Sequence, residues 1–447
     1  MTATETDLAP DTGRHADHAW NPVTRIVFRF CFSYFGLFCL FFPWMWFSYL
    51  IAFRRVLPDD ATVWSARPVA PIVGWVGRHL FGVSAVPNPY SQGDDPFEWV
   101  LVFCILVAAV AVTVMWSLLD RRRTEYRGPA DGFLLAMRLA LAGQMFYYGV
   151  AKLIPNQMPE PPLATWLQRF GDFSPDMVLW NQVGYSQPYE MLLGAAEVLG
   201  GVLLLLPRTA VLGAMLCLAD MAQVFVLNMT FGVSVKLLSA HLILLSVVLL
   251  APRTRQLLDA VVLGRATAAV PGGRRSRRTI TTLQVAALIW LAVGNGYQNW
   301  RLWYEIGGGR PVSALYGIWE VTSFDRDGQS RPLLLTDRDL WRRIVFDDPD
   351  TMTYQQTDDR LVPVIAHIDT AAHRVTLSRP DPGSAPSEGP DHHPSGSSFA
   401  VLDYQRPEPN HLRLTGDLDG HHVTITLDLV DPASFPLRAS RFQWVQR

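Results

Sequence analysis

Long apolar stretches, separated by short polar ones, occupy the first 300 residues of the chain. A helix needs about 20 predominantly apolar residues to cross the hydrocarbon core of a bilayer. Windows of this kind occur seven times, at residues 27–53, 97–119, 131–154, 188–206, 209–228, 233–251 and 279–300. The pattern therefore predicts an α-helical polytopic membrane bundle of about seven spans within residues 23–300.

Two connections between the expected spans are long. The stretch Val69–Val86 is apolar but is interrupted by three glycines and Arg78. Spanning, interfacial and re-entrant placements all stay open for it, and its broken pattern favours an interfacial or re-entrant helix. Residues 155–187 begin with a stiff proline-rich segment, followed by two short amphipathic pieces that carry Trp166 and Trp180.

From Val312 onward apolar and polar positions alternate, as in β-strands. A Gly-x-Trp strand opens at 315–321, and further strands are expected at 343–346, 351–356, 361–368, 373–378, 399–404, 411–415, 421–430 and 440–446. The sequences Gly317-Ile318-Trp319 and Phe442-Gln443-Trp444-Val445 resemble the closing arrangement of lipocalin-like barrels, in which the tryptophan plugs one end. Residues 312–447 are therefore expected to form an antiparallel β-barrel domain, with a generic β-sandwich as the alternative.

Two further segments are expected to lack regular structure. Residues 1–22 begin polar and acidic and predict a disordered N-terminus. Residues 380–398 are rich in proline, glycine and serine and predict a mobile loop. This loop contains His392-His393, but neighbouring histidines in such a loop lack the fixed outer contacts that a metal site needs.

Composition supports a membrane protein and excludes several other classes. Hydrophobic residues make up 49% of the chain and charged residues 17%, and the net charge of −2 gives no argument for nucleic acid as a partner. All four cysteines lie within expected spans, and no Cys-x-x-Cys is present. This distribution indicates neither a disulfide framework nor a zinc or iron–sulfur site.

Arginine clusters predict the orientation. Arg121–Arg123 with Arg127 follow the second span, and arginines 253, 255, 274, 275, 277 and 278 precede the seventh. Loops rich in lysine and arginine stay in the cytoplasm. We therefore expect a multi-pass protein of the cell membrane with a cytoplasmic N-terminus and an extracytoplasmic C-terminal domain. Arg54 and Arg55, which follow the first span, argue mildly against this orientation.

The expected spans contain polar residues where hydrocarbon makes them costly. Such residues usually face a bundle interior, pair with each other or line a pathway. The predicted intramembrane polar site consists of Arg138, Gln144, Lys152, Glu190, Glu197, Asp220, Asn228, Lys236 and His241. No catalytic residue and no metal ligand can be assigned among them. The competing interpretation is a satisfied polar network that holds the bundle together.

These residues fall into layers when their distance from the outer end of each expected span is counted. Gln144, Glu197, Asp220 and His241 each lie eight to ten residues from the expected outer ends of their spans, and so share one depth. Lys152, Glu190, Asn228 and Lys236 form a layer nearer the outer surface, and Arg138 lies deeper. We expect an outward-opening cavity beside the shared layer, and an ion pair of Lys152 with Glu190 or Glu197.

Three features resemble the DoxX family of four-helix membrane proteins. They are Arg138, the stretch Gly149-Val150-Ala151-Lys152, and the stretch Glu197-Val198-Leu199-Gly200-Gly201. Family members typically show an arginine and a Gly-x-x-Lys in the first helix and a Glu-x-x-Gly-Gly in the second. The resemblance covers residues 131–251 and supports Arg138, Lys152 and Glu197 as site residues.

The resemblance implies a quinone context, because named DoxX members are associated with quinone-linked oxidation of thiosulfate and with resistance to quinones and thiol stress. One hypothesis is therefore a quinone-linked membrane oxidoreductase or its subunit. Because no haem, flavin or iron–sulfur motif is recognisable, a partner redox subunit would carry the electrons. The alternatives are a non-enzymatic binding or carrier protein for lipid or another small molecule, and a membrane assembly factor.

Overall fold

The computed structural model describes residues 20–439, apart from residues 92, 262, 265–273, 333, 335, 336, 338 and 381–395. The predicted N-terminal lead, His392-His393 and the predicted strand 440–446 thus lie outside the described residues. The chain forms two compact units. The helical unit comprises Met1–Val150 and Ala195–Tyr297, and the barrel unit comprises Ala151–Gly194 and Gln298–Arg447.

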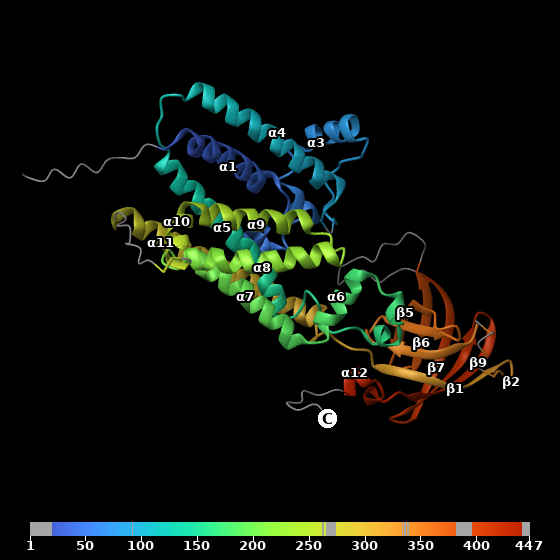
Figure 1. The fold of residues 1–447 in the computed structure, drawn as a ribbon. Coiled ribbons are helices and arrows are strands. Elements are labelled where there is room, and N and C mark those ends of the chain that lie inside the picture. The colour runs from blue at the N-terminus through green and yellow to red at the C-terminus, as the bar shows by residue number, and fades with distance from the viewer. Residues whose placement is uncertain are drawn as a thin grey trace, which may run out of the picture. The chain divides into compact units, whose positions relative to one another are not determined.

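Seven helices in the described residues are long and apolar enough to cross a membrane. They are α1 (Pro22–Phe41), α4 (Pro96–Leu119), α5 (Arg127–Leu153), α7 (Gln187–Leu205), α8 (Ala210–Thr230), α9 (Lys236–Leu250) with its helical continuation to Asp259, and α11 (Arg274–Glu305) from Thr279 onward. Within the helical unit, α1 runs beside α4 and α8 runs beside α9 (Figure 1). The prediction of about seven long apolar helices is confirmed.

The first helix is shorter than its apolar window. The prediction placed a span at 27–53, whereas α1 ends at Phe41 and a short helix, α2 (Phe47–Leu50), follows after a turn. Pro43 explains the break, because a proline disfavours helical geometry in the residue before it. Phe42 is accordingly extended, with φ −69° and ψ 130°.

The broken apolar stretch at 69–86 forms one short helical piece. Helix α3 (Ala70–Val76) continues into a π-helical turn, η3 (Gly77–Phe81), and ends at Gly82 with φ +66°. Twelve residues at about 1.5 Å each are too few to cross a bilayer. The spanning alternative is therefore excluded, and Ile72, Trp75 and Leu80 present exposed apolar side chains.

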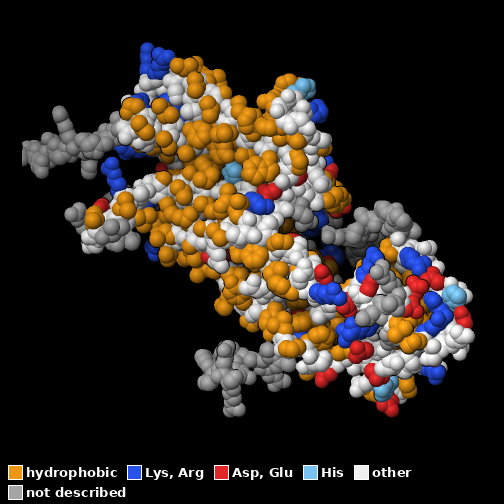
Figure 2. All heavy atoms as spheres, turned by 45° about the vertical axis from the view of Figure 1, so that its right-hand side comes forward, with side chains coloured by type: hydrophobic (Ala, Val, Ile, Leu, Met, Phe, Trp, Pro, Cys, Tyr) orange, Lys and Arg blue, Asp and Glu red, His pale blue; other side chains and the backbone are white. Residues whose placement is uncertain are grey.

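Glycines allow three helices of the helical unit to pack closely. A Cβ on Gly149 of α5 would lie 3.0 Å from the Val198 backbone nitrogen on α7. A Cβ on Gly213 of α8 would lie 2.5 Å from the Leu204 backbone nitrogen on α7. Small residues at such crossings are typical of packed membrane helices. Apolar side chains dominate the face of the helical unit seen in Figure 2, as expected of a lipid-facing surface.

The C-terminal strands close into an antiparallel barrel. Its eight strands in the described residues are β1 (Gly317–Arg326), β3 (Trp341–Phe346), β4 (Thr351–Gln356), β5 (Leu361–Asp369), β6 (Arg374–Pro380), β7 (Gly396–Glu408), β8 (His411–Leu418) and β9 (His421–Leu429). Each strand pairs with the next, and β1 pairs with β9. The two-residue β2 (Gln329–Ser330) extends β1. The barrel prediction is confirmed, and the β-sandwich alternative is wrong.

The Gly-x-Trp sequence lies at the start of the closing strand β1. Gly317 has φ +141°, a backbone conformation that favours glycine, and a Cβ there would also lie 2.5 Å from Leu429 Cδ1. Trp319 is fully buried, and its Nε1 donates to the Leu315 carbonyl at 2.8 Å. The guanidinium of Arg406 lies 5.4 Å from the centre of the Trp319 ring system. This tryptophan anchors the barrel core.

The long connection at 155–187 belongs to the barrel unit. It contains two 3₁₀ turns, Leu163–Leu167 and Phe170–Asp172, and helix α6 (Pro175–Gly184). The Leu163 amide donates to the Asp347 carboxylate at 2.9 Å in the turn between β3 and β4. These contacts bind the connection to the barrel, although the sequence assigned it to the helical domain.

Candidate functional site

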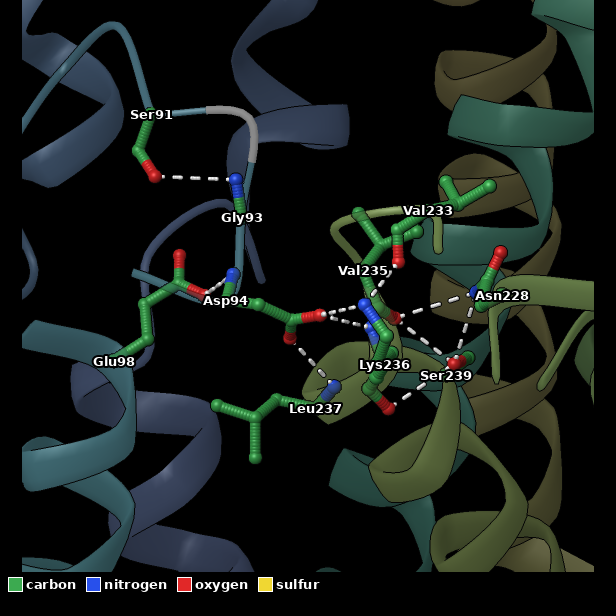
Figure 3. A network of polar contacts seen from close by, with 10 residues as sticks. All are labelled: Ser91, Gly93, Asp94, Glu98, Asn228, Val233, Val235, Lys236, Leu237 and Ser239. Carbon is green, nitrogen blue, oxygen red and sulfur yellow. Dashed lines mark hydrogen bonds and ion pairs between the residues drawn. The ribbon is translucent and has the colours of Figure 1, made fainter. Parts of the chain in front are cut away.

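A network of polar contacts joins the loop before α4 to the start of α9 (Figure 3). The Asp94 carboxylate accepts from the backbone amides of Lys236 at 2.8 Å and Leu237 at 2.9 Å. These are first-turn amides of α9, which have no partner within the helix. The Lys236 ammonium lies 3.5 Å from the same carboxylate and donates to the Val233 carbonyl at 2.8 Å. Asp94 therefore caps α9 and fixes Lys236.

The same network continues from α9 to α8. The Asn228 side-chain amide donates to Ser239 Oγ at 3.1 Å, and Ser239 Oγ donates to the Val235 carbonyl at 2.9 Å. Figure 3 shows the Asn228 side chain directed at Val235 and Ser239, next to Lys236 at the start of α9. The predicted outer layer thus brings Asn228 and Lys236 together, with contacts that hold the α8–α9 connection in place.

Asp94 and Glu98 were missed as polar groups of this layer. The Asp95 carboxylate accepts from the Glu98 amide at 2.9 Å, and Glu98 Oε2 accepts from the Asp94 amide at 2.8 Å. Aspartate, proline and then glutamate three residues after the cap form a recognisable helix start. That signal is readable at Asp95-Pro96-Phe97-Glu98, but nothing in the sequence links it to α9.

His241 forms a buried pair with a tyrosine from α1. Its Nδ1 lies 2.7 Å from the Leu237 carbonyl, and its Nε2 lies 2.8 Å from the Tyr34 hydroxyl. A carbonyl only accepts, so in the neutral ring Nδ1 carries the proton and Nε2 accepts from Tyr34. The Phe38 ring stacks on the imidazole, with centres 4.0 Å apart. Both polar groups lie in apolar surroundings.

Gln144 is placed differently from His241. Its side-chain nitrogen donates to the Trp44 carbonyl at 3.0 Å and the Met45 carbonyl at 3.1 Å, which lie in the turn after α1. Its oxygen is buried and accepts no hydrogen bond within the described part of the chain. Gln144 therefore supports the break at Pro43 and leaves one buried acceptor unused.

Two carboxylates of the predicted layer lie near one cysteine. Glu197 on α7 and Asp220 on α8 are both within electrostatic range of Cys217. Glu197 is also within range of the Tyr148 phenol on α5, as is Glu98. The helical unit thus holds a second group of ionisable side chains on α4, α5, α7 and α8.

Glu190 and Lys152 fall within the barrel unit. Glu190 is fully buried, and its Oε1 accepts from the Met158 amide at 2.9 Å. Its Oε2 accepts no hydrogen bond from the residues that the structure describes. The charge of Lys152 acts on Glu190, in keeping with one of the two predicted pairings. The pairing of Lys152 with Glu197 stays a prediction.

Arg138 lines a cavity at the opposite end of the helical unit. Its Nε and Nη2 donate to the Leu204 carbonyl at 2.9 and 2.5 Å, near the end of α7. The cavity has a volume of about 710 Å³. It lies between the start of α5, the α7–α8 turn, the end of α9 and Ile280 of α11. Of the predicted site residues, Arg138 is the one that lines this cavity.

Local contacts shift the pKa of two carboxyl groups in the barrel unit in opposite directions. Burial raises the pKa of Asp347, although the Leu163 amide and Arg310 partly oppose this. The hydrogen bond from Arg169, with the nearby charge of Arg342, lowers the pKa of Asp359. Among the described residues, no three His, Cys, Asp or Glu side chains gather closely enough to hold a metal ion.

Similarity to known proteins covers part of the chain. Over 122 residues the chain is 34% identical to the uncharacterized protein YwoB of Bacillus subtilis (strain 168). This alignment spans 25% of the chain and 71% of YwoB. No protein-family model matches the chain, and no solved structure is significantly similar to it. The resemblance to the DoxX family therefore stays a prediction.

Proposed function

The chain belongs to the same family as the uncharacterized protein YwoB, and from this premise we propose that it binds the head group of a quinone within its helical unit. The unit has helices of the length and composition of a multi-pass membrane protein. A quinone is lipid-soluble and presents two carbonyl oxygens, so it needs donors at membrane depth.

The observation that carries the proposal is the His241–Tyr34 pair. Its hydroxyl and imidazole are buried and hydrogen-bonded to each other at 2.8 Å. Phe38 stacks on the imidazole, and a flat quinone ring packs against aromatic side chains in the same way. When a ligand separates this pair, the Tyr34 hydroxyl becomes a donor for a quinone carbonyl, and Nε2 of His241 becomes an acceptor for the hydroxyl of a quinol.

The helical unit also contains side chains that could supply protons for the reduction of a quinone. Reduction of a quinone to a quinol takes up two electrons and two protons. His241, Glu197 and Asp220 are groups on neighbouring helices that can hold protons. The electrons would come from a partner redox subunit, so we propose a quinone-handling component and not a complete oxidoreductase.

The proposal includes an orientation. Arginines 121–123 and 127 follow α4, and arginines 253, 255, 274, 275, 277 and 278 precede the apolar part of α11. By the positive-inside rule these ends are cytoplasmic. The N-terminus is then cytoplasmic, the barrel extracytoplasmic, and the Asp94–Lys236 network lies toward the outer surface.

Co-purification tests the proposed ligand. The full-length protein is purified in mild detergent, and bound quinone per protein is measured by mass spectrometry after extraction. We expect Tyr34→Phe and His241→Phe to lower the bound quinone about tenfold, which corresponds to one lost buried hydrogen bond. Tyr49→Phe is the matched control, because it removes a hydroxyl that donates to the Leu139 carbonyl in the same unit.

Three results would argue against the proposal. They are a wild-type protein without quinone, an equal loss in the Tyr49→Phe control, and retention of quinone by both site variants. Stoichiometric recovery of another lipid in place of quinone would instead favour a carrier function. Thermal unfolding of each variant shows whether a loss of quinone reflects a loss of folding.

A further inference from the structure

The cavity around Arg138 combines apolar walls with positive charge. Leu134 and Leu135 of α5 line it, as do Val211 of α8 and Leu249 of α9. Its volume of about 710 Å³ is within the range of small-molecule sites in proteins. This cavity plays no part in the proposed quinone site, because Tyr34 and His241 do not line it.

Arg138 donates its hydrogen bonds to an uncharged backbone carbonyl, so this contact does not neutralise its positive charge. Pro207 has no amide hydrogen, so the Leu203 carbonyl accepts from Thr209 Oγ1 instead, at 3.0 Å. The next carbonyl, Leu204, accepts from Arg138. Within the described residues, Arg138 forms no ion pair with a carboxylate. The guanidinium therefore holds the end of α7 and still presents a net positive charge at the cavity.

Further positive charge gathers at the same end. Arg253 lines the cavity and is exposed, while Asp131 adds one negative charge at the start of α5. The site is thus suited to an anion.

Neighbouring apolar side chains indicate that the anion is part of a lipid. Leu212 follows the lining residue Val211 and is exposed, and Leu283 lies one turn beyond Ile280 and is exposed. Acyl chains can lie along these exposed faces of α8 and α11 while the head group occupies the cavity. A soluble anion would gain nothing from such surfaces.

We propose that this cavity binds the phosphate head group of an acidic phospholipid, with Arg138 and Arg253 supplying the positive charge. Basic pockets between helix ends on the cytoplasmic side are suited to such head groups. The inference goes beyond quinone binding and takes only the choice of the cytoplasmic leaflet from the proposed orientation. It gives the protein a specific lipid partner at a site separate from His241.

Native mass spectrometry of the delipidated full-length protein tests this site. Phosphatidylglycerol, phosphatidylcholine and inorganic phosphate are added separately, and the bound fraction is measured against concentration. We expect one phosphatidylglycerol to bind in preference to phosphatidylcholine. Arg253→Gln should weaken phosphatidylglycerol about fivefold and Arg253→Glu about 25-fold, in line with the effect of one and two charges near an anionic head group.

Matched variants separate the cavity from general charge. Arg122→Gln and Arg122→Glu make the same changes at an exposed position outside the cavity and should leave binding unchanged. Leu135→Trp should reduce lipid binding by filling the cavity without altering charge. Arg138 itself is avoided as the first variant, because its loss would also free the Leu204 carbonyl. Variants are compared only where thermal unfolding matches the wild type.

Several results would overturn the proposal. They are equal binding of the two phospholipids, an equal effect of the Arg122 and Arg253 variants, and unchanged binding in Leu135→Trp. Displacement of phosphatidylglycerol by an equal concentration of inorganic phosphate would show that the site recognises a free anion and not a lipid. Quinone content, measured in parallel, should be unaffected by Arg253→Gln, so failure of one proposal is distinguishable from failure of the other.

Discussion

Asp359 lies where the turn between β4 and β5 meets the connection before α6. Arg169 donates to one of its carboxylate oxygens at 2.6 Å, and Arg342 donates to the other at 2.7 Å. The lowered pKa of Asp359 follows from these two cations. A carboxylate with a depressed pKa in the folded state stabilises that state only while it is ionised.

We therefore expect Asp359→Asn to lower the stability of the full-length protein at pH 7 by up to about 1 kcal/mol, as for a partly exposed ion pair. The contribution of Asp359 is present above the ordinary aspartate pKa of 3.8 and is lost as the pH falls through the lower folded value. The difference in melting temperature between variant and wild type should accordingly shrink below about pH 4. A difference that grows on acidification would contradict this, and Asp358→Asn serves as a neighbouring control.

Single polar residues were predictable as candidates but their partners were not. Lys236 and His241 were identified because charge inside an apolar window is unusual. Tyr34 and Asp94 were not identified, because a tyrosine in a span and an aspartate in a loop are common. Their importance comes from long-range packing against α9, which a single sequence does not reveal.

Helix starts in the helical unit depend on acidic caps. Asp94 caps α9 across the bundle, whereas Asp95 caps α4 locally. Asp94 has φ +54°, and a Cβ on the preceding Gly93 would lie 2.1 Å from the Ser234 carbonyl oxygen. The loop before α4 and the start of α9 are therefore held in close contact.

The caps should differ in their effect on stability. We expect Asp94→Ala to cost about 2 kcal/mol, because it removes the acceptor for two amides and the partner of Lys236. Asp95→Ala should cost about 1 kcal/mol, since one amide loses its acceptor. Asp94→Asn, which tolerates the left-handed backbone, controls for strain and should be milder than Asp94→Ala. Thermal unfolding monitored by tryptophan fluorescence gives the order, and equal costs for the two alanine variants would contradict the bridging role of Asp94.

At the level of elements, periodicity predicted the seven apolar helices and most strands of the barrel. It could not place the end of α1, because the apolar run continues past Pro43. It also assigned residues 155–187 to the helical domain, because sequence order says nothing of which unit a connection packs against. In the structure this connection belongs to the barrel unit, because Leu163 contacts the β3–β4 turn and Arg169 contacts the β4–β5 turn.

The whole molecule combines a helical unit with apolar outer faces and a barrel unit with a charged surface. In Figure 2 lysine, arginine, aspartate and glutamate side chains gather over the barrel, while apolar side chains dominate the helical unit. Such a division fits a membrane-embedded part and a water-exposed part. The proposed quinone site and the proposed phospholipid site both depend on this arrangement, since each ligand would be taken from the bilayer.

Membrane topology is thus the central claim, and reporter fusions in cells test it most directly. Alkaline phosphatase, which is active only outside the cytoplasm, and a fluorescent protein that matures only in the cytoplasm are each fused after Arg447, with fusions after Arg123 as the cytoplasmic reference. We predict phosphatase activity and no fluorescence at Arg447, and the reverse at Arg123. Fluorescence without phosphatase activity at Arg447 would place the barrel in the cytoplasm and contradict the account.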